Sequence, residues 1–122
     1  RNIILHTKGD SMSNFCYITD AVRAILILLS QGEVGEAYNV CHDEETRSIA
    51  SSANLVACHV GEDKISVIFD IPENLSSFGY APTVHMFLNS KKMRSLSWEP
   101  QVSMKEAYMR LAEYIKEERH HE

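Results

Sequence analysis

The residue types that allow nucleophilic catalysis in this sequence are the serine, histidine and aspartate of a hydrolase triad. Four residues near the N-terminus supply these types: His6, Ser11, Ser13 and Asp20. In a triad the histidine takes the proton of the serine, and the aspartate orients the histidine. Neither serine stands in the G-x-S-x-G turn that exposes such a nucleophile in one large hydrolase class. We therefore predict no catalytic residue in this chain.

Metal ligation is the second chemical possibility. His42 stands beside the acidic run Asp43-Glu44-Glu45, whose oxygens are ligands that hard cations prefer. The histidines do not show the spacing of a zinc site, and an acidic surface loop explains the run without a metal. The cysteines, Cys16, Cys41 and Cys58, are too far apart to form a CxxC pair. We predict no metal site, and cysteines that are reduced and lie in the core.

Charge and composition exclude several classes of partner. The net charge of −5 argues against nucleic acid, which is bound through clustered Lys and Arg side chains. The longest apolar run, residues 24–29, is far shorter than the roughly 20 residues that a membrane helix needs. No basic segment followed by an apolar one opens the chain, which begins at Arg1. We expect a cytoplasmic protein with no nucleic-acid or membrane partner.

The elements that must position these residues alternate between strands and helices. Strands are expected where β-branched and aromatic residues lie between turn residues, over 2–7, 15–18, 37–41, 64–69 and 84–88. Helices are expected over 21–30, 48–60, 89–96 and 103–116. The sequence predicts a mixed α/β fold, in which short strands pack with about four helices. It is expected to form a single domain over residues 1–116, followed by a frayed tail over residues 117–122.

Two of these helices carry distinct local signals. Residues 21–30 are apolar nearly all round, which predicts a deeply buried helix, and Gly32 would supply a left-handed residue at its end. Thr19-Asp20 offers a cap for its first turn. The last helix begins with a capping box, Ser103-Met104-Lys105-Glu106. Trp98, between the last two helices, is predicted to be a packing residue that anchors the turn there.

Five short fragments follow one another along the chain in a recognisable order. They are Asn14 to Val22, Gly35-Glu36-Ala37-Tyr38-Asn39-Val40, Ser48-Ile49, Leu88-Asn89-x-x-Lys92 and Leu96-Ser97-Trp98-Glu99-Pro100. Together they resemble the C-terminal portion of the nucleotide-sugar epimerases and dehydratases, a family of extended short-chain dehydrogenases/reductases. The match is collinear from Ile3 to Ile115. The pattern is most similar to those of the dTDP-glucose 4,6-dehydratases and the UDP-glucuronate decarboxylases, and of these two the dehydratase is the favoured interpretation.

The resemblance implies a substrate-side domain that lacks the cofactor-binding and catalytic parts of the family. The family binds NAD(P) through a glycine-rich turn, but here Gly32 and Gly35 are followed by Tyr38 where the third glycine belongs. The catalytic Tyr-x-x-x-Lys pair of the family is also missing, because no tyrosine has a lysine four residues later. We expect that the N-terminal Rossmann domain is absent, that this chain binds no cofactor, and that it is inactive alone. NAD is expected in the intact parent enzyme.

The resemblance also implies which residues approach a substrate. Residues 3–9 would approach the nucleotide base, and residues 9–15 would approach the diphosphate. The implied substrate-binding residues are Leu5, Gly9, Ser13, Asn14, Phe15 and His85. The family places arginines at the position of Ser13 and near that of His85. A serine hydroxyl offers one neutral donor in place of a charged fork, which weakens binding by about 1–3 kcal/mol.

Two functions remain open on these residues. The first is the substrate-binding portion of an NAD-dependent dehydratase or epimerase, whose partners would be a nucleotide-diphosphate sugar and the missing N-terminal cofactor domain. The second is a diverged stand-alone binding or protein-interaction module that has lost sugar-nucleotide chemistry. In the family the strand expected at 37–41 joins the sheet of the cofactor domain. Alone, its open edge would favour a homodimer or weak order near Tyr38.

Overall fold

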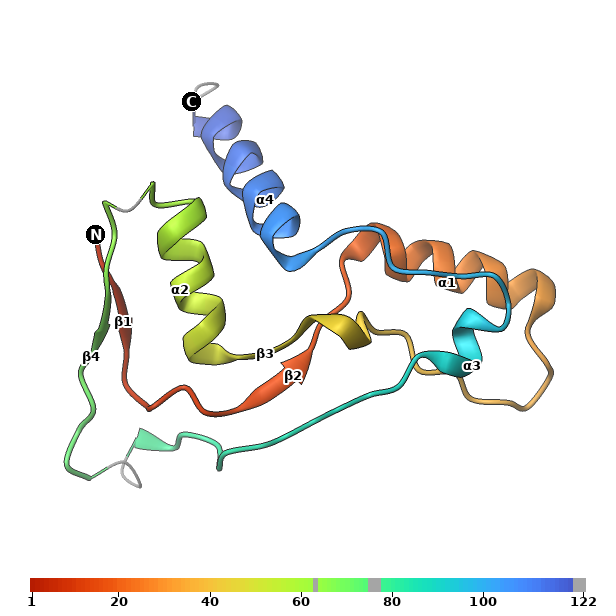
Figure 1. Ribbon diagram of the computed structural model, residues 1–122, viewed down its shortest axis with the longest axis horizontal. Coiled ribbons are helices and arrows are strands. Elements are labelled where there is room, and N and C mark those ends of the chain that lie inside the picture. Colours follow the sequence, from red (N-terminus) through yellow and green to blue (C-terminus); the bar gives the residue numbers. More distant parts are fainter. Residues whose placement is uncertain (63, 75–77, 120–122) are drawn as a thin grey trace.

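The computed structural model describes residues 1–62, 64–74 and 78–119 of the chain. The helices are α1 (Ile18–Gln31), α2 (Ile49–His59), α3 (Lys91–Arg94) and α4 (Met104–Arg119), with a 3₁₀ turn over Asp43–Glu45. The strands are β1 (Ile3–Leu5), β2 (Met12–Asn14), β3 (Thr46–Ser48) and β4 (Val67–Phe69). Figure 1 shows these elements in an open arrangement, with α1 and α4 diverging from one region. The predicted mixed α/β fold is confirmed.

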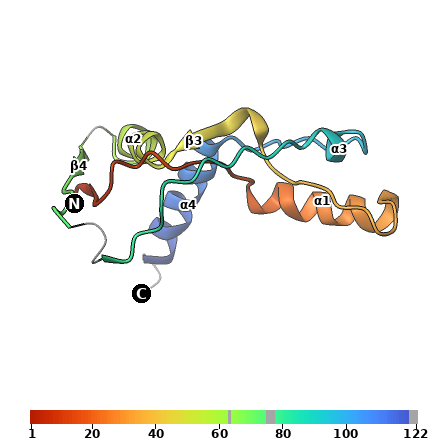
Figure 2. The same cartoon turned by 90° about the horizontal axis from the view of Figure 1, so that it is seen from below.

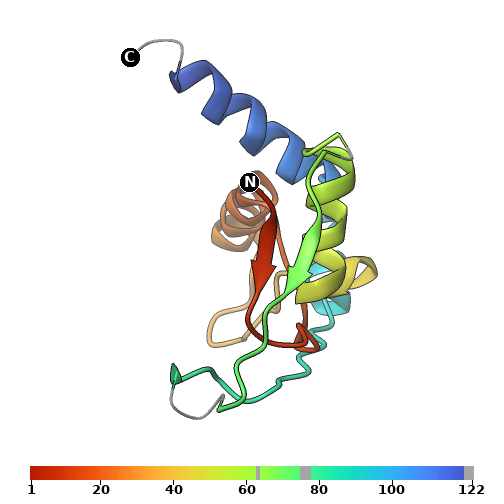
Figure 3. The ribbon, with the colours of Figure 1, turned by 90° about the vertical axis from the view of Figure 1, so that its left-hand side faces the viewer.

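The described strands form two small sheets of two strands each. β1 pairs in parallel with β4, Ile3 opposite Val67, and Figure 3 shows the two strands side by side next to α2. β2 pairs in antiparallel fashion with β3, Ser13 opposite Arg47. A single parallel bridge joins Met12 to His85, so the segment around His85 runs along the other side of β2. The strand expected at 84–88 is thus reduced to one bridge in the described residues.

Helix α2 forms where its periodicity predicts it. Ser48 caps it, because its Oγ accepts a hydrogen bond from the Ser51 N–H at 3.0 Å. The first N–H groups of a helix have no partner within the helix. Here the Ile49 and Ala50 N–H groups donate to the carbonyls of Ser11 and Gly9, each at 3.0 Å. The start of α2 therefore holds the loop between β1 and β2 in place.

The small core lies where α1, α3 and Trp98 meet. Ala24, Met93 and Trp98 are fully buried there. The partly buried residues packed against them are Cys16, Ile27, Leu28, Tyr38 and Val40. The indole Nε1 of Trp98 donates to the Asp20 carbonyl at 3.0 Å, and this contact between distant segments agrees with the anchoring role predicted for Trp98.

Several expectations for α1 are wrong. The helix begins at Ile18, so Asp20 lies within its first turn and is not a cap. Gly32 has a φ of −69°, so the left-handed position expected there is absent. The prediction of a helix buried all round fails on one side, where Leu26 is 60% and Leu29 80% exposed. The reason is physical: the described core contacts only the opposite face, which carries Ala24.

The strands expected at 15–18 and 37–41 are absent from the described structure. The first strand of this region comes earlier, at Met12–Asn14, because that segment is the one that finds pairing partners on both sides. Residues 37–41 form no ladder with another segment. Instead, the Tyr38 ring packs on the core, and its hydroxyl accepts a hydrogen bond from the Glu33 N–H at 3.2 Å.

Helix α4 begins as the capping box predicts, since the Ser103 Oγ accepts a hydrogen bond from the Glu106 N–H at 3.3 Å. It continues to Arg119, so residues 117–119 of the expected frayed tail are helical. Residues 120–122 of that tail lie outside the described part of the chain. Among the described helices, none has both the length and the apolar character needed to cross a bilayer.

Candidate ligand pocket

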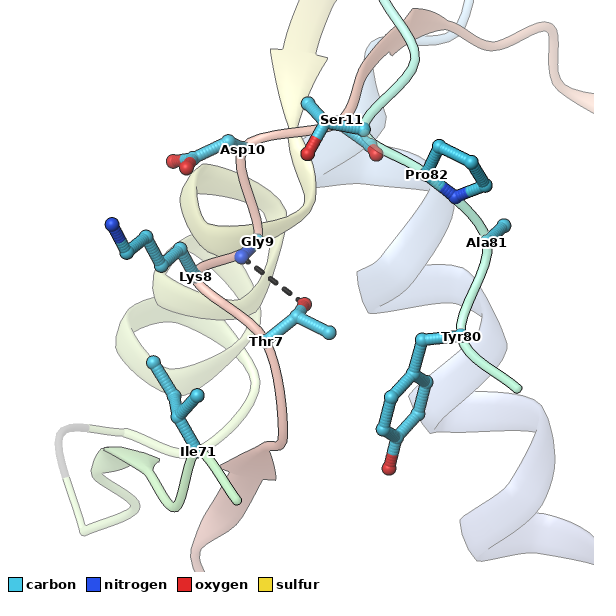
Figure 4. A pocket seen from close by; sticks show the side chains of 10 residues that line it. Thr7, Lys8, Gly9, Asp10, Ser11, Ile71, Tyr80, Ala81 and Pro82 are labelled. Carbon is cyan, nitrogen blue, oxygen red and sulfur yellow. Dashed lines mark hydrogen bonds between the residues drawn. The ribbon is translucent and has the colours of Figure 1, made fainter. Parts of the chain in front are cut away.

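A pocket of about 360 Å³ opens beside the loop that follows β1. One wall is the loop itself, residues 7–11, and the opposite wall is the segment 80–83, with Ile71 below (Figure 4). These segments are more than sixty residues apart in the sequence. The pocket therefore forms only when the loop between β1 and β2 lies beside the segment 80–83, which leads to His85.

Gly9 determines the shape of the loop wall. Its φ is +69°, in the left-handed region that side chains disfavour. An added Cβ would lie 2.8 Å from the Ala50 backbone nitrogen, at the start of α2. The Gly9 N–H donates to the Thr7 Oγ1 at 3.2 Å, which turns the Thr7 hydroxyl toward the loop (Figure 4). Glycine is thus required here both by backbone conformation and by the close approach of α2.

An aromatic ring forms the opposite wall. Tyr80 stands across the opening from Thr7 and Ile71, while the side chains of Lys8 and Asp10 point away from it (Figure 4). Phe78 stacks on Tyr80 with ring centroids 6.0 Å apart and planes 17° from parallel. Such a pair offers a flat apolar surface, and flat heteroaromatic rings such as nucleobases stack on surfaces of this kind. The pocket can therefore accommodate a planar ring beside the backbone of the loop.

Of the residues predicted to bind substrate, only Gly9 lines this pocket. Leu5 lies at the end of β1, and its carbonyl accepts a hydrogen bond from the Asp70 N–H at 2.9 Å. Asn14 is buried, and its side-chain amide donates to the Leu88 carbonyl at 2.7 Å and accepts from the Leu88 N–H at 3.2 Å. Leu5 and Asn14 thus support the frame of the pocket through these bonds.

Ser13, Phe15 and His85 lie elsewhere. Phe15 lines an apolar groove of about 480 Å³ between the start of α1 and α4. Paired residues in neighbouring strands share a face, and successive residues alternate between faces. His85 pairs with Met12, so it lies on the face opposite to Ser13. Ser13 and His85 therefore lie on opposite faces and do not converge on one point in this chain.

Sequence reasoning missed several residues of the site. Ile71 and Tyr80 line the pocket although neither was expected there, whereas Thr7 falls within the segment 3–9 that was expected to approach the base. The signal that was available is the loop composition around Gly79 and Pro82, which marks a turn but not its contact with residue 7. Arg47 was also missed. It lies directly opposite Ser13 across β2 and β3, where its Nε donates to the Glu45 Oε2 at 2.9 Å.

Asp20, which lies in the family-like fragment Asn14 to Val22, is buried and has a structural role. Its Oδ2 accepts hydrogen bonds from the Gln101 N–H at 2.9 Å and the Val102 N–H at 3.0 Å. Its Oδ1 accepts from the Arg23 Nη1 at 2.8 Å. With these bonds Asp20 ties the segment before α4 to α1, and both of its oxygens are engaged by Arg23, Gln101 and Val102.

The acidic run after His42 is also held by internal contacts. The Arg94 Nη2 donates to the Asp43 Oδ1 at 2.7 Å, and the Ser90 Oγ donates to the Asp43 Oδ2 at 2.9 Å. Burial opposes ionisation of Asp43, but the hydrogen bonds from Arg94 and Ser90 outweigh it and hold its pKa below the usual value. Within the described residues, no three His, Cys, Asp or Glu side chains gather as metal ligands would.

The half-buried cysteine at the start of α1 is a poor nucleophile. Burial, with smaller contributions from the charges of Asp20 and Cys41, raises the pKa of the Cys16 thiol to about 11. Because the thiolate is the reactive form, Cys16 is almost entirely in the unreactive thiol form at neutral pH. Burial likewise raises the pKa of Cys41. Cys58, in contrast, is exposed on α2, so the prediction that all cysteines lie in the core is wrong for Cys58.

No protein-family model matches the sequence. The chain is 27% identical to human dTDP-D-glucose 4,6-dehydratase, over 98% of this chain and 34% of the human protein. It is 22% identical to dTDP-glucose 4,6-dehydratase 1 of Escherichia coli, over 90% of this chain and 31% of that protein. The chain thus spans about a third of the length of the curated relatives that it matches.

The solved structures give the same answer for the fold. UDP-glucose 4-epimerase of Thermotoga maritima, solved with UDP-glucose, is similar with a TM-score of 0.75 and 22% identity, over 96% of this chain and 35% of the epimerase. dTDP-glucose 4,6-dehydratase of Bacillus anthracis, solved with NAD, is similar with a TM-score of 0.74 and 18% identity, over 96% and 35%. The predicted resemblance to the C-terminal portion of these enzymes is confirmed.

Proposed function

We propose that this chain, whose fold is that of the C-terminal third of an extended short-chain dehydrogenase/reductase, is the part of a dTDP-glucose 4,6-dehydratase-like enzyme that binds a nucleotide-diphosphate sugar. The observation that carries the proposal is the similarity to dTDP-D-glucose 4,6-dehydratases over 98% of the chain. We place the nucleotide base in the pocket between Thr7 and Tyr80. The chain would be inactive without a cofactor-binding half that holds NAD, and the complete enzyme would act in the cytoplasm.

The geometry supports binding of the nucleotide base more strongly than binding of the diphosphate. The pocket offers the Tyr80 ring for stacking, the hydroxyls of Ser11 and Thr83, and the backbone of residues 7–9 for edge contacts. A diphosphate is best held by arginine, whose planar fork makes two charge-assisted hydrogen bonds. No arginine lines the pocket among the described residues, and the side chain of Lys8, the one lysine in its lining, points away from the opening. We therefore expect the base to contribute most of the affinity of this chain for a sugar nucleotide.

The experiment is a titration of the isotope-labelled chain with thymidine, dTDP and UDP, followed by residue-resolved amide chemical shifts. We expect the largest changes at Thr7, Gly9 and Tyr80, and no change at Gly35. Because the described pocket has no arginine, dTDP should bind less than about tenfold more tightly than thymidine. Addition of NAD should leave these resonances unchanged.

The matched variants are Tyr80→Ala and Tyr114→Ala. Loss of a stacking ring typically costs about 1–3 kcal/mol for each base. Tyr80→Ala should therefore weaken dTDP binding at least fivefold, whereas Tyr114→Ala, an exposed tyrosine on α4, should not change it. Absence of any shift near Gly9 at millimolar dTDP would end the proposal and would favour the alternative, a binding module that has lost sugar-nucleotide chemistry.

A further inference from the structure

Strand β3 carries an arginine on the same face of its small sheet as Ser13. The register places Arg47 directly opposite Ser13, and directly opposite side chains lie on one face, with Cβ atoms about 4.5–5.5 Å apart. The pairing continues past the ends of the two strands, since the Ile49 N–H donates to the Ser11 carbonyl at 3.0 Å. Because successive side chains of a strand alternate between its faces, Ser11 shares this face with Ser13 and Arg47.

This face adjoins the ligand pocket. Ser11 lines the pocket, and Ser13 follows it along β2 at a distance of about 7 Å, since a strand rises by roughly 3.3 Å per residue. Figure 2 shows β3 at the upper edge of the molecule and the segment over residues 78–83, which includes the other pocket wall, well below it. In a nucleotide, the sugar separates the base from the diphosphate. A base held in the pocket can therefore place its diphosphate beside Ser13 and Arg47.

Two hydrogen-bond donors on this face have no partner among the described residues. The Arg47 Nε donates to the Glu45 Oε2 at 2.9 Å, which leaves both terminal amino groups of the guanidinium without a partner there. The Ser13 hydroxyl likewise makes no hydrogen bond within the described part of the chain. The Arg47 side chain is 34% exposed, so a ligand can reach it. A guanidinium beside a hydroxyl is a set of donors that suits phosphate oxygens.

Glu45 limits the attraction that Arg47 exerts on an anion. Its side chain is only 16% exposed, and its ion pair with Arg47 holds the guanidinium in one orientation. A side chain that is already oriented loses less entropy when a ligand binds. The negative charge of Glu45 nevertheless repels a diphosphate and cancels part of the attraction of Arg47. The pair therefore favours a charged ligand over a neutral one by a modest factor.

We propose that Arg47, weakened by Glu45 and assisted by the Ser13 hydroxyl, is the residue through which this chain prefers a nucleoside diphosphate to the uncharged nucleoside. This proposal rests on the proposed function and assigns recognition of the diphosphate to strand β3, outside the lining of the pocket. Two other cations near the pocket are unsuitable. The side chain of Lys8 points away from the opening (Figure 4), and His85 lies on the opposite face of β2.

The test compares the affinities for dTDP and thymidine, measured by amide chemical shifts, in the parent chain and its variants. The parent should bind dTDP about three- to tenfold more tightly than thymidine, and Arg47→Gln should bind the two within about twofold of each other. Arg110→Gln is the matched control, because Arg110 also pairs with a glutamate, Glu106, but on α4, and it should keep the parent ratio. A parent without any preference for dTDP, or an Arg47→Gln variant that keeps the parent ratio, would overturn the proposal.

Two further variants decide the question if Arg47→Gln does not fold. Glu45→Gln removes the opposing charge and keeps the guanidinium, so it should raise the preference for dTDP at least about twofold above that of the parent. Arg47→Lys keeps the charge but lacks the planar fork, so its preference should lie between those of the parent and of a chain without the cation. A Glu45→Gln variant with a lower preference than the parent would contradict the role assigned to the pair.

Separate resonances distinguish this proposal from the proposed function. The Arg47 side-chain Nε–H and the Ser13 amide should shift with dTDP and with inorganic diphosphate, but not with thymidine. Shifts at Gly9 with thymidine, together with an unmoved Arg47 Nε–H at saturating dTDP, would keep the base pocket and overturn the role of Arg47. Shifts of Arg47 and Ser13 with inorganic diphosphate, without any shift at Gly9 with thymidine, would uphold Arg47 as the diphosphate contact and remove the base pocket.

Discussion

Replacing Asp20 by alanine should destabilise the chain more than any change of a surface acid. The carboxylate is 1% exposed and accepts hydrogen bonds from the backbone N–H groups of Gln101 and Val102 and from Arg23. Asp20→Ala leaves the two N–H groups without their acceptor, at about 1–3 kcal/mol each, and deprives Arg23 of its counter-ion. We expect a total loss of about 3–5 kcal/mol in the free energy of unfolding, which is the range for breaking a buried charge pair.

The assay is urea unfolding followed by far-ultraviolet circular dichroism, at a temperature where the parent chain is fully folded. Glu118→Ala is the control, because Glu118 is exposed on α4, and it should change the free energy of unfolding by less than about 0.5 kcal/mol. Asp20→Asn, which keeps one acceptor oxygen, should lie between the two. A free energy of unfolding for Asp20→Ala within about 1 kcal/mol of the parent value, with an unchanged slope, would refute the role assigned to this carboxylate.

Two more predictions concern the loop and the acidic run. Gly9→Ala should lower the free energy of unfolding by about 2–4 kcal/mol, because left-handed backbone strain adds to a contact of 2.8 Å between the new Cβ and the Ala50 nitrogen. Gly35→Ala, the control with open space around it, should lower it by only about 1–2 kcal/mol. Equal melting temperatures for the two variants would contradict the close approach of Ala50 to Gly9. Asp43 has a lowered pKa in the folded chain, so its contribution is complete above its unfolded pKa of about 4 and is lost as the pH falls through the folded pKa. Asp43→Asn should reduce the fall in the free energy of unfolding as the pH drops below about 4. An unchanged fall would show that the Arg94 contact does not stabilise the fold.

The parts of the fold that follow from sequence are those with local signals. Ser48 and Ser103 mark the starts of α2 and α4 because a capping hydroxyl bonds an N–H three residues later, and the structure has both bonds. Strand β2 has no such signal. Its polar residues are extended because β3 and His85 pair with them, and these partners are distant in sequence. Propensity alone places the strand three residues too late, at 15–18 instead of Met12–Asn14.

The residues of the candidate site also differ in whether a local sequence signal predicts them. Gly9 could be predicted, because a turn beside a strand favours glycine and the family pattern indicates the position. Tyr80 could not, because its place in the pocket depends on how the segment before His85 runs past β2. The role of Asp20 was misread for a related reason. Its position suggested a cap, whereas its acceptors serve Gln101 and Val102, more than eighty residues away.

The bonds between Asn14 and Leu88 bear on the order in which this chain becomes structured during synthesis. The two residues are 74 positions apart, and β1 and β4 are separated by a similar length. Ribosomes add about 5–20 residues each second, so β1 waits several seconds for β4, and Asn14 waits several seconds for Leu88. Closing a loop of this length also has an entropic cost that local contacts do not carry. Strand β1 is therefore made well before it is fixed by β4, a period in which its apolar residues Ile3, Ile4 and Leu5 are open to chaperones and to other nascent chains.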